Sequence, residues 1–172
     1  MLKDYTRGAL KVLSDYSISM LFFAVFFLIF YKYLFVYSLV IFFLMVSFLY
    51  SGMRKLALKE RKPQYKINHF PIKGIIYGVL GFLPVIIATL VIPIIPLQLE
   101  AFDMQRLKHV AVNTLLSPLY WVIKLGNEKS YVYLLSYLVV PVISLFGYLA
   151  GYYGFELRKF LGGGIRDSRE GS

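Results

Sequence analysis

A small polar cluster beyond the middle of the chain holds residue types that acid/base chemistry needs: Asp103, Arg106, His109 and Asn113. In a helix, residues three, four or seven positions apart lie on one side, so this spacing would bring the four close together. A histidine beside a carboxylate can exchange protons near neutral pH. Charges interspersed with polar residues on a short segment are more typical of a solvated face, and that is the role we expect.

Other signatures of catalysis are missing from the sequence. It contains no cysteine, which excludes disulfides, thiolate metal sites and a cysteine nucleophile. No serine-hydrolase, zinc-protease or phosphate-loop motif occurs, and the histidines and carboxylates show no metal-ligand spacing. We therefore expect no metal and no cofactor, and we favour a protein that is not an enzyme.

The composition indicates an all-α integral membrane protein. Hydrophobic residues make up 59% of the 172 residues, charged residues only 16%, and the mean hydropathy is +0.67. The net charge of +10 does not indicate a nucleic-acid partner, because basic residues in so apolar a chain mark the cytoplasmic side or a contact with anionic lipid. We expect one membrane domain over residues 1–161 and a polar, flexible tail over 162–172.

The longest apolar run, from Tyr16 to Tyr50, contains one charge, Lys32. As one straight helix it would be about 52 Å long, well beyond the ~30 Å hydrocarbon core of a bilayer. A hairpin fits better, with its turn at residues 31–33, where two tyrosines and the lysine suit the headgroup level. The predicted spans are residues 12–31 and 34–53.

A basic loop follows the hairpin and predicts the orientation of the chain. By the positive-inside rule this loop is cytoplasmic, and its basic residues are expected to contact lipid headgroups: Arg54, Lys55, Lys59, Arg61, Lys62 and Lys66. Two further spans, over residues 74–97 and 131–155, complete about four transmembrane helices with both ends in the cytoplasm. The charge pattern suits the cytoplasmic membrane of a prokaryote.

Residues 110–123 are apolar over too short a stretch for a typical span. We expect an external interfacial or re-entrant segment, with Tyr120 and Trp121 as interface anchors and a true fifth span as the alternative. At the N-terminus, apolar residues recur at helical spacing from Leu2 to Tyr16, which predicts an amphipathic helix on the inner headgroup surface. A cleaved signal peptide is the less favoured alternative for this end.

Two glycine ladders with the same spacing lie in the third and fourth spans: Gly74, Gly78 and Gly81 in one, and Gly147, Gly151 and Gly154 in the other. Small residues four apart let helix backbones approach closely in lipid. Both ladders are expected in the cytoplasmic half of the membrane. We therefore predict that these two spans pack against each other, or against a partner helix, along their glycine faces, although glycine is also simply common in membrane helices.

The functional prediction is a small noncatalytic membrane protein, a subunit or scaffold of a larger membrane complex. Its expected partners are lipids and other membrane proteins or further copies of itself, because the phenylalanine-rich first hairpin offers broad apolar faces. A transport or permeation component is the alternative, favoured by Pro84, Pro93 and Pro141 in the spans. A lipid-modifying enzyme that uses Asp103 and His109 ranks third.

Overall fold

The computed structural model describes residues 2–61, 70–95 and 104–154, and all regular secondary structure in these ranges is helical. The elements are α1 (Leu2–Phe30), a 3-10 turn (Tyr31–Tyr33), α2 (Leu34–Glu60), α3 (Lys73–Val91), α4 (Met104–Leu115), a second 3-10 turn (Ser117–Leu119), α5 (Tyr120–Leu125) and α6 (Ser130–Tyr152). Three helical stretches of the described chain are long and apolar enough to cross a membrane: Tyr5–Glu60, Lys73–Val91 and Ser130–Tyr152. The chain is thus an all-helical protein suited to an integral membrane location.

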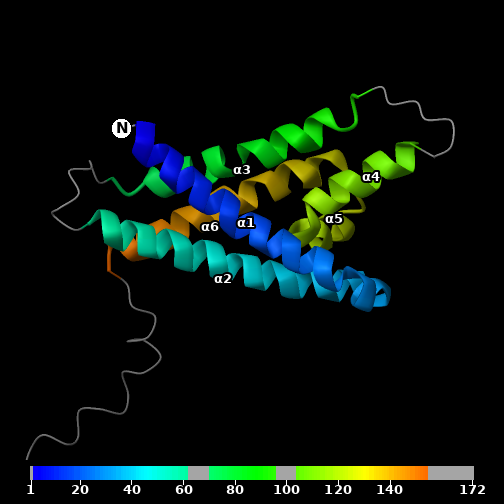
Figure 1. Cartoon of the computed structure of the whole chain (residues 1–172), viewed down its shortest axis with the longest axis horizontal. Coiled ribbons are helices and arrows are strands. Elements are labelled where there is room, and N and C mark those ends of the chain that lie inside the picture. The colour runs from blue at the N-terminus through cyan, green and yellow to red at the C-terminus, as the bar shows by residue number, and fades with distance from the viewer. Residues whose placement is uncertain (1, 62–69, 96–103, 155–172) are drawn as a thin grey trace, which may run out of the picture.

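The first of these stretches folds back on itself at Tyr31–Tyr33, the residues where the sequence predicts a turn. α1 and α2 therefore run antiparallel, side by side (Figure 1). Tyr37 closes the hairpin near its turn, since its hydroxyl donates to the carbonyl of Phe22 at 2.7 Å and its ring stacks on Phe23. Further from the turn, Gly52 of α2 lies directly against the carboxylate of Asp15.

The N-terminal segment is helical, as predicted, and α1 continues from Leu2 to Phe30 without a break between this segment and the first span. Its inward side packs on α3: the ring of Tyr5 meets the edge of the Tyr77 ring at a centroid distance of 5.8 Å, and Gly8 lies beneath that same ring. Gly81 of α3 faces the α1 backbone at Ala9. Glycines at both crossing points let the two helices approach closely, so the apolar side of the segment is covered by protein.

The four long helices pack in the cyclic order α1, α2, α6, α3, each against two others (Figure 1). The core between them combines aromatic rings with flexible methionines, and its fully buried members include Tyr16, Met45, Leu49, Met53, Tyr77, Phe82 and Tyr148. Tyr16 and Phe82 meet edge to face with centroids 4.9 Å apart, which joins α1 to α3. Such a ring of four helices buries one side of each helix and leaves the other outside.

The segment from α4 to α5 is an interrupted helix that enters the bundle. Ser38 of α2 holds the interruption, since its hydroxyl donates to the carbonyl of Ser117 at 2.8 Å and accepts from the backbone N–H of Trp121 at 3.1 Å. Tyr16 donates to the carbonyl of Leu115 at 2.7 Å. Trp121, predicted as an interface anchor, packs edge-on against Phe42 of α2. These contacts attach the interrupted helix to α1 and α2.

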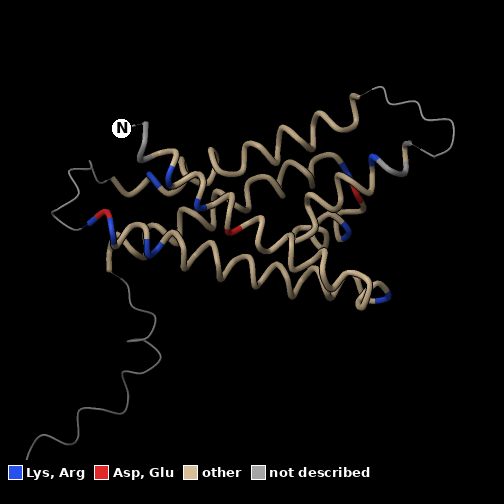
Figure 2. Tube along the Cα trace, in the orientation of Figure 1, with Lys and Arg blue, Asp and Glu red and all other residues tan. Residues whose placement is uncertain are grey.

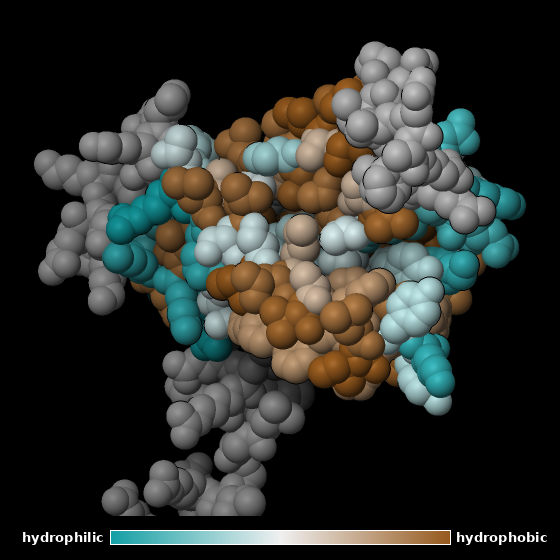
Figure 3. Space-filling view, turned by 45° about the vertical axis from the view of Figure 1, so that its right-hand side comes forward, coloured by the Kyte–Doolittle hydropathy of each residue, from teal (hydrophilic) through white to brown (hydrophobic). Residues whose placement is uncertain are grey.

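Polar and apolar residues are segregated along the bundle. Most lysines and arginines lie toward the two ends of the long helices, with few charges between them (Figure 2). The surface between these ends is largely hydrophobic in the view of Figure 3. Exposed apolar side chains occur on all four long helices, for example Leu28, Phe43, Ile87 and Leu138. This distribution is typical of a protein surrounded by lipid.

Candidate functional site

The glycine ladder of α3 is a helix-packing surface inside the bundle. A methyl group added to Gly74 would lie 2.5 Å from Cβ of Tyr148, and one added to Gly78 would lie 2.5 Å from Cα of Pro141. Both neighbours belong to α6, so these two glycines allow the close contact of α3 with α6. A methyl group on Gly81 would lie 2.6 Å from the carbonyl oxygen of Ala9, and this glycine therefore serves the contact with α1.

The ladder of α6 faces a different helix from the one expected. A methyl group on Gly147 would lie 2.8 Å from the carbonyl oxygen of Tyr50, and one on Gly151 would lie 2.5 Å from that of Arg54. Both oxygens belong to α2. The two ladders therefore do not face each other, because α6 is packed on two sides and presents a different side to each neighbour. Gly154 follows the end of α6 with a φ of +72°, a conformation that glycine adopts without strain.

A buried carboxylate joins three helices at the end of the bundle where α2 finishes and α3 begins. Glu60 accepts hydrogen bonds from the hydroxyls of Tyr77 at 2.9 Å and Tyr148 at 2.8 Å. The ammonium group of Lys73 lies 3.3 Å from the same carboxylate and about 5.6 Å from the ring centroid of Tyr5. The side chains of Glu60 and Lys73 are 6% and 3% exposed. Glu60 thus has both an opposite charge and two neutral donors, as a buried carboxylate requires.

The polar centre around Glu60 does not by itself resemble a catalytic site. Each oxygen of the carboxylate is directed at side chains of the bundle, one at Tyr77 and the other at Lys73 and Tyr148. Its geometry instead suits a structural role, because one carboxylate from α2 is bound by side chains of α3 and α6. Sequence reasoning missed this cluster. The available signal was Glu60 itself, a lone acid among basic residues.

The predicted headgroup contacts lie beside this carboxylate at the end of α2. Lys55, Lys59 and Arg61 are exposed there, and Arg54 is partly buried against α6. Lys62 and Lys66 lie outside the described residues. The exposed basic side chains occupy one end of the bundle, where cationic groups can approach anionic headgroups (Figure 2).

The residues of the predicted polar cluster are not shown to form a common site. Asp103 lies outside the described residues, and of Arg106 only the backbone, within α4, is described. His109 is half exposed, with its Nε2 3.5 Å from the carboxylate of Glu128. Asn113 lines a separate small cavity with Phe23 and Phe27, and its side-chain oxygen is buried without a hydrogen-bond partner. His109 and Asn113 thus lie in different surroundings, one beside Glu128 and the other in the small cavity.

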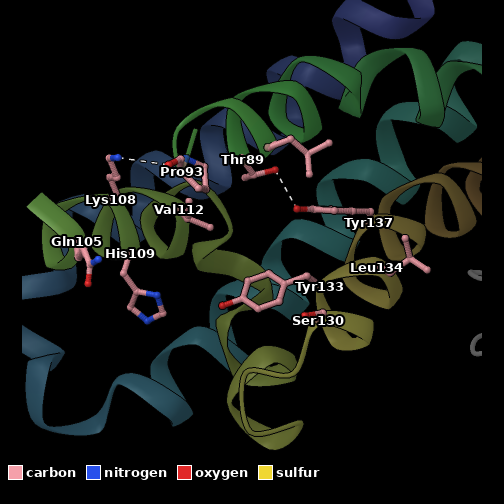
Figure 4. Close-up of a pocket in the computed structure, with 11 residues that line it drawn as sticks. Thr89, Pro93, Gln105, Lys108, His109, Val112, Ser130, Tyr133, Leu134 and Tyr137 are labelled. Carbon is pink, nitrogen blue, oxygen red and sulfur yellow. Dashed lines mark hydrogen bonds between the residues drawn. The ribbon is translucent and has the colours of Figure 1, made fainter. Parts of the chain in front are cut away.

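An open cavity of about 680 Å³ lies between the end of α3, the helix α4 and the start of α6. The buried Thr89 and the half-buried Tyr137 line it with hydroxyls that are 3.0 Å apart, and Thr89 also donates to the carbonyl of Ile86. Lys108 and His109 line the cavity from α4, and the hydroxyl of Tyr133 is turned toward the His109 side (Figure 4). This cavity joins cationic, hydroxyl and apolar groups, a lining suited to ligand binding.

No cluster of three or more His, Cys, Asp or Glu that could hold a metal ion occurs among the residues that the structure describes. Comparison of the chain with protein family models, with curated proteins and with solved structures finds no match. The candidate sites are therefore defined by the contacts of this chain alone.

Proposed function

We propose that this chain is a small noncatalytic protein that crosses the membrane four times and serves as a subunit or scaffold of a larger membrane complex. The observation that carries the proposal is an apolar groove of about 420 Å³ between α2 and α6. Its lining residues are all apolar, among them Phe42, Phe43, Val46, Leu135 and Leu138. The proposed occupant is an apolar transmembrane helix of another subunit.

Packing inside the bundle supports this assignment. The glycine faces, which would be the usual close-contact surfaces for a partner helix, are already covered by α1, α2, α3 and α6. The α2–α6 groove is a concave surface that these contacts leave open along two helices. A partner helix with medium-sized apolar side chains could bury those side chains in the groove. In lipid, van der Waals contact drives such helix association.

Helix lengths support four crossings with both chain ends in the cytoplasm. α3, the shortest of the four long helices with 19 residues, is about 28 Å long, close to the ~30 Å of the hydrocarbon core. The basic end of α2 would then face the cytoplasm, and the turn at Tyr31–Tyr33 would face the opposite side. The prokaryotic cytoplasmic membrane stays a hypothesis that rests on this charge pattern.

The topology is testable because the chain has no native cysteine. Single cysteines replacing Lys32 and Lys55 would be treated in intact cells with a maleimide reagent that does not cross membranes. We expect labelling at position 32 in intact cells and at position 55 only after permeabilisation. Labelling of both positions from the same side would contradict the two crossings of the first hairpin.

The partner is tested with a photo-reactive amino acid at Leu138, in the groove. The matched control is Ile87 on the outer side of α3, since these side chains are 55% and 51% exposed. We expect crosslinking from position 138 to give a protein adduct of one defined mass, and crosslinking from position 87 to give none. The substitution Leu138→Trp should abolish the intact complex in mild detergent. A mass of twice this chain would identify a second copy as the partner. Equal adducts from both positions would refute a specific groove.

A transport or permeation component is the second candidate, favoured by the open cavity beside α3 and α6. Pro141 gives it less support, because that residue is buried against Gly78 in a helix contact. Solute flux in vesicles containing only this chain would separate the two proposals, since a subunit without catalytic or transport activity should produce none.

A further inference from the structure

The cavity between α3, α4 and α6 combines a positively charged side with an apolar side, and this division identifies a class of ligand. Lys108 and His109 approach from α4. Leu90 and Leu134, from α3 and α6, line the cavity and are themselves more than half exposed to the surroundings of the bundle. Among the lining residues that the structure describes, none is a carboxylate. A ligand that matched both sides would carry a negative charge at one end and a hydrocarbon chain at the other.

The side chains of Lys108 and His109 have hydrogen-bond donors or exposed surface left with which to bind an anion. The ammonium group of Lys108 donates to the carbonyl of Pro93 at 3.3 Å, which uses one of its three donors and holds the side chain across the cavity. The imidazole of His109 is 53% exposed, and Glu128, whose carboxylate lies 3.5 Å from it, also lies 3.6 Å from the ammonium group of Lys124. The described residues around this side include three lysines, Lys108, Lys124 and Lys129, and one carboxylate, Glu128. The local net charge is therefore positive and favours an anion.

The cavity also lies at a depth that suits such a ligand. It occupies the last turn of α3, which ends at Val91, and the first two turns of α6, which begins at Ser130. Where apolar helices end, a bilayer changes from hydrocarbon to headgroups. The Thr89–Tyr137 pair lies on the inner wall of the cavity (Figure 4), whereas Leu90 and Leu134 are 56% and 66% exposed to the surroundings of the bundle. A chain entering from the hydrocarbon would place its head near α4.

We propose that this cavity binds an anionic amphiphile, with its charged head at Lys108 and His109 and its hydrocarbon chain between Leu90 and Leu134. The hydroxyl of Tyr133, on the His109 side, supplies a further donor to the head. Two sources share this chemistry, a free fatty acid and an acidic phospholipid of the bilayer. The site is independent of the α2–α6 groove, which lies on another side of α6.

The test uses the purified full-length chain in phosphatidylcholine nanodiscs and measures the unfolding temperature as oleate is added. A ligand that binds only the folded state raises this temperature in a saturable way. Oleyl alcohol has the same chain without the charge and should cause no saturable rise, and inorganic phosphate supplies charge without a chain and should also have no effect. An equal rise of the unfolding temperature with oleyl alcohol or with phosphate would overturn the proposal, because the cavity would then not require both a negative charge and a hydrocarbon chain.

Variants locate the binding. Lys108→Gln is expected to raise the Kd for oleate about tenfold, since a charge-assisted hydrogen bond is lost. Lys55→Gln, a change to an exposed lysine at the opposite end of the bundle, should leave the Kd unchanged, and Lys108→Arg should keep binding close to that of the wild type. Leu90→Trp should fill the cavity and abolish the saturable rise, while Val91→Trp, one residue further along α3, should not.

The remaining outcomes separate the source of the ligand from the validity of the site. If phosphatidylglycerol nanodiscs stabilise the wild type but not Lys108→Gln, and the wild type in them no longer responds to oleate, the ligand is the bilayer phospholipid. If only oleate raises the unfolding temperature, the ligand is the fatty acid. Both results support the site. An unchanged Kd in Lys108→Gln, in a variant whose unfolding temperature without oleate equals that of the wild type, would refute it.

Discussion

Removing the carboxylate of Glu60 should destabilise the bundle more than any other change of a single acidic side chain in the described chain. The substitution Glu60→Ala leaves the ammonium group of Lys73, 3% exposed, without its counter-charge and leaves the hydroxyls of Tyr77 and Tyr148 without an acceptor. Breaking a buried ion pair from one side costs about 3–5 kcal/mol, because the remaining charge stays buried. We expect a loss of this size in the free energy of unfolding.

The double variant isolates the pair from its surroundings. Lys73→Met alone should also be costly, since the carboxylate of Glu60 then keeps only its two tyrosine donors. In the double variant Glu60→Ala with Lys73→Met neither charge is present, so its stability should exceed that expected from adding the two single losses, by about 2–3 kcal/mol. Additive losses would show that the two charges do not interact in the folded state.

Denaturant unfolding in mild detergent provides the measurement, followed by the fluorescence of Trp121, the one tryptophan of the chain. The control is Glu128→Ala, which removes a carboxylate that also lies near a lysine, at 3.6 Å, but is 35% exposed. Exposed pairs contribute about 0–1 kcal/mol, so this variant should unfold almost as the wild type does. If Glu60→Ala were as mild as Glu128→Ala, the burial argument for Glu60 would be refuted.

Three further substitutions test other contacts. Gly151→Ala should lower the free energy of unfolding by about 1–3 kcal/mol, because the added methyl group would lie 2.5 Å from a carbonyl oxygen of α2; unchanged denaturant unfolding would contradict the close contact. Ser38→Ala should release the interrupted helix from α2, at a cost of about 1–3 kcal/mol, and shift the emission of Trp121 toward that of an exposed indole. His109→Ala removes only an exposed pair with Glu128 and should change the stability by less than about 1 kcal/mol; a larger loss in a thermal melt would mean that the histidine is structurally bound.

The candidate sites were only partly predictable. His109 drew notice from its type and spacing, but its cavity also needs Lys108 of the same helix and Thr89 and Tyr133 of two other helices. The glycine ladders were visible as a spacing, yet that spacing does not say which neighbour each glycine meets. Glu60 was hidden among basic residues, because a lone acid in such a segment looks like part of a solvated surface.

Hydrophobic composition and run length by themselves determined that the chain is helical and suited to a membrane, because a run of apolar residues can leave water only if its backbone is hydrogen-bonded internally. The excess length of the first run and the residues at Tyr31–Tyr33 likewise located the hairpin turn. Only the tertiary structure decided that α6 lies between α2 and α3, that α1 extends onto α3, and that Glu60 is buried. These features depend on the rotation of each helix about its axis and on contacts between distant residues, which local periodicity does not specify.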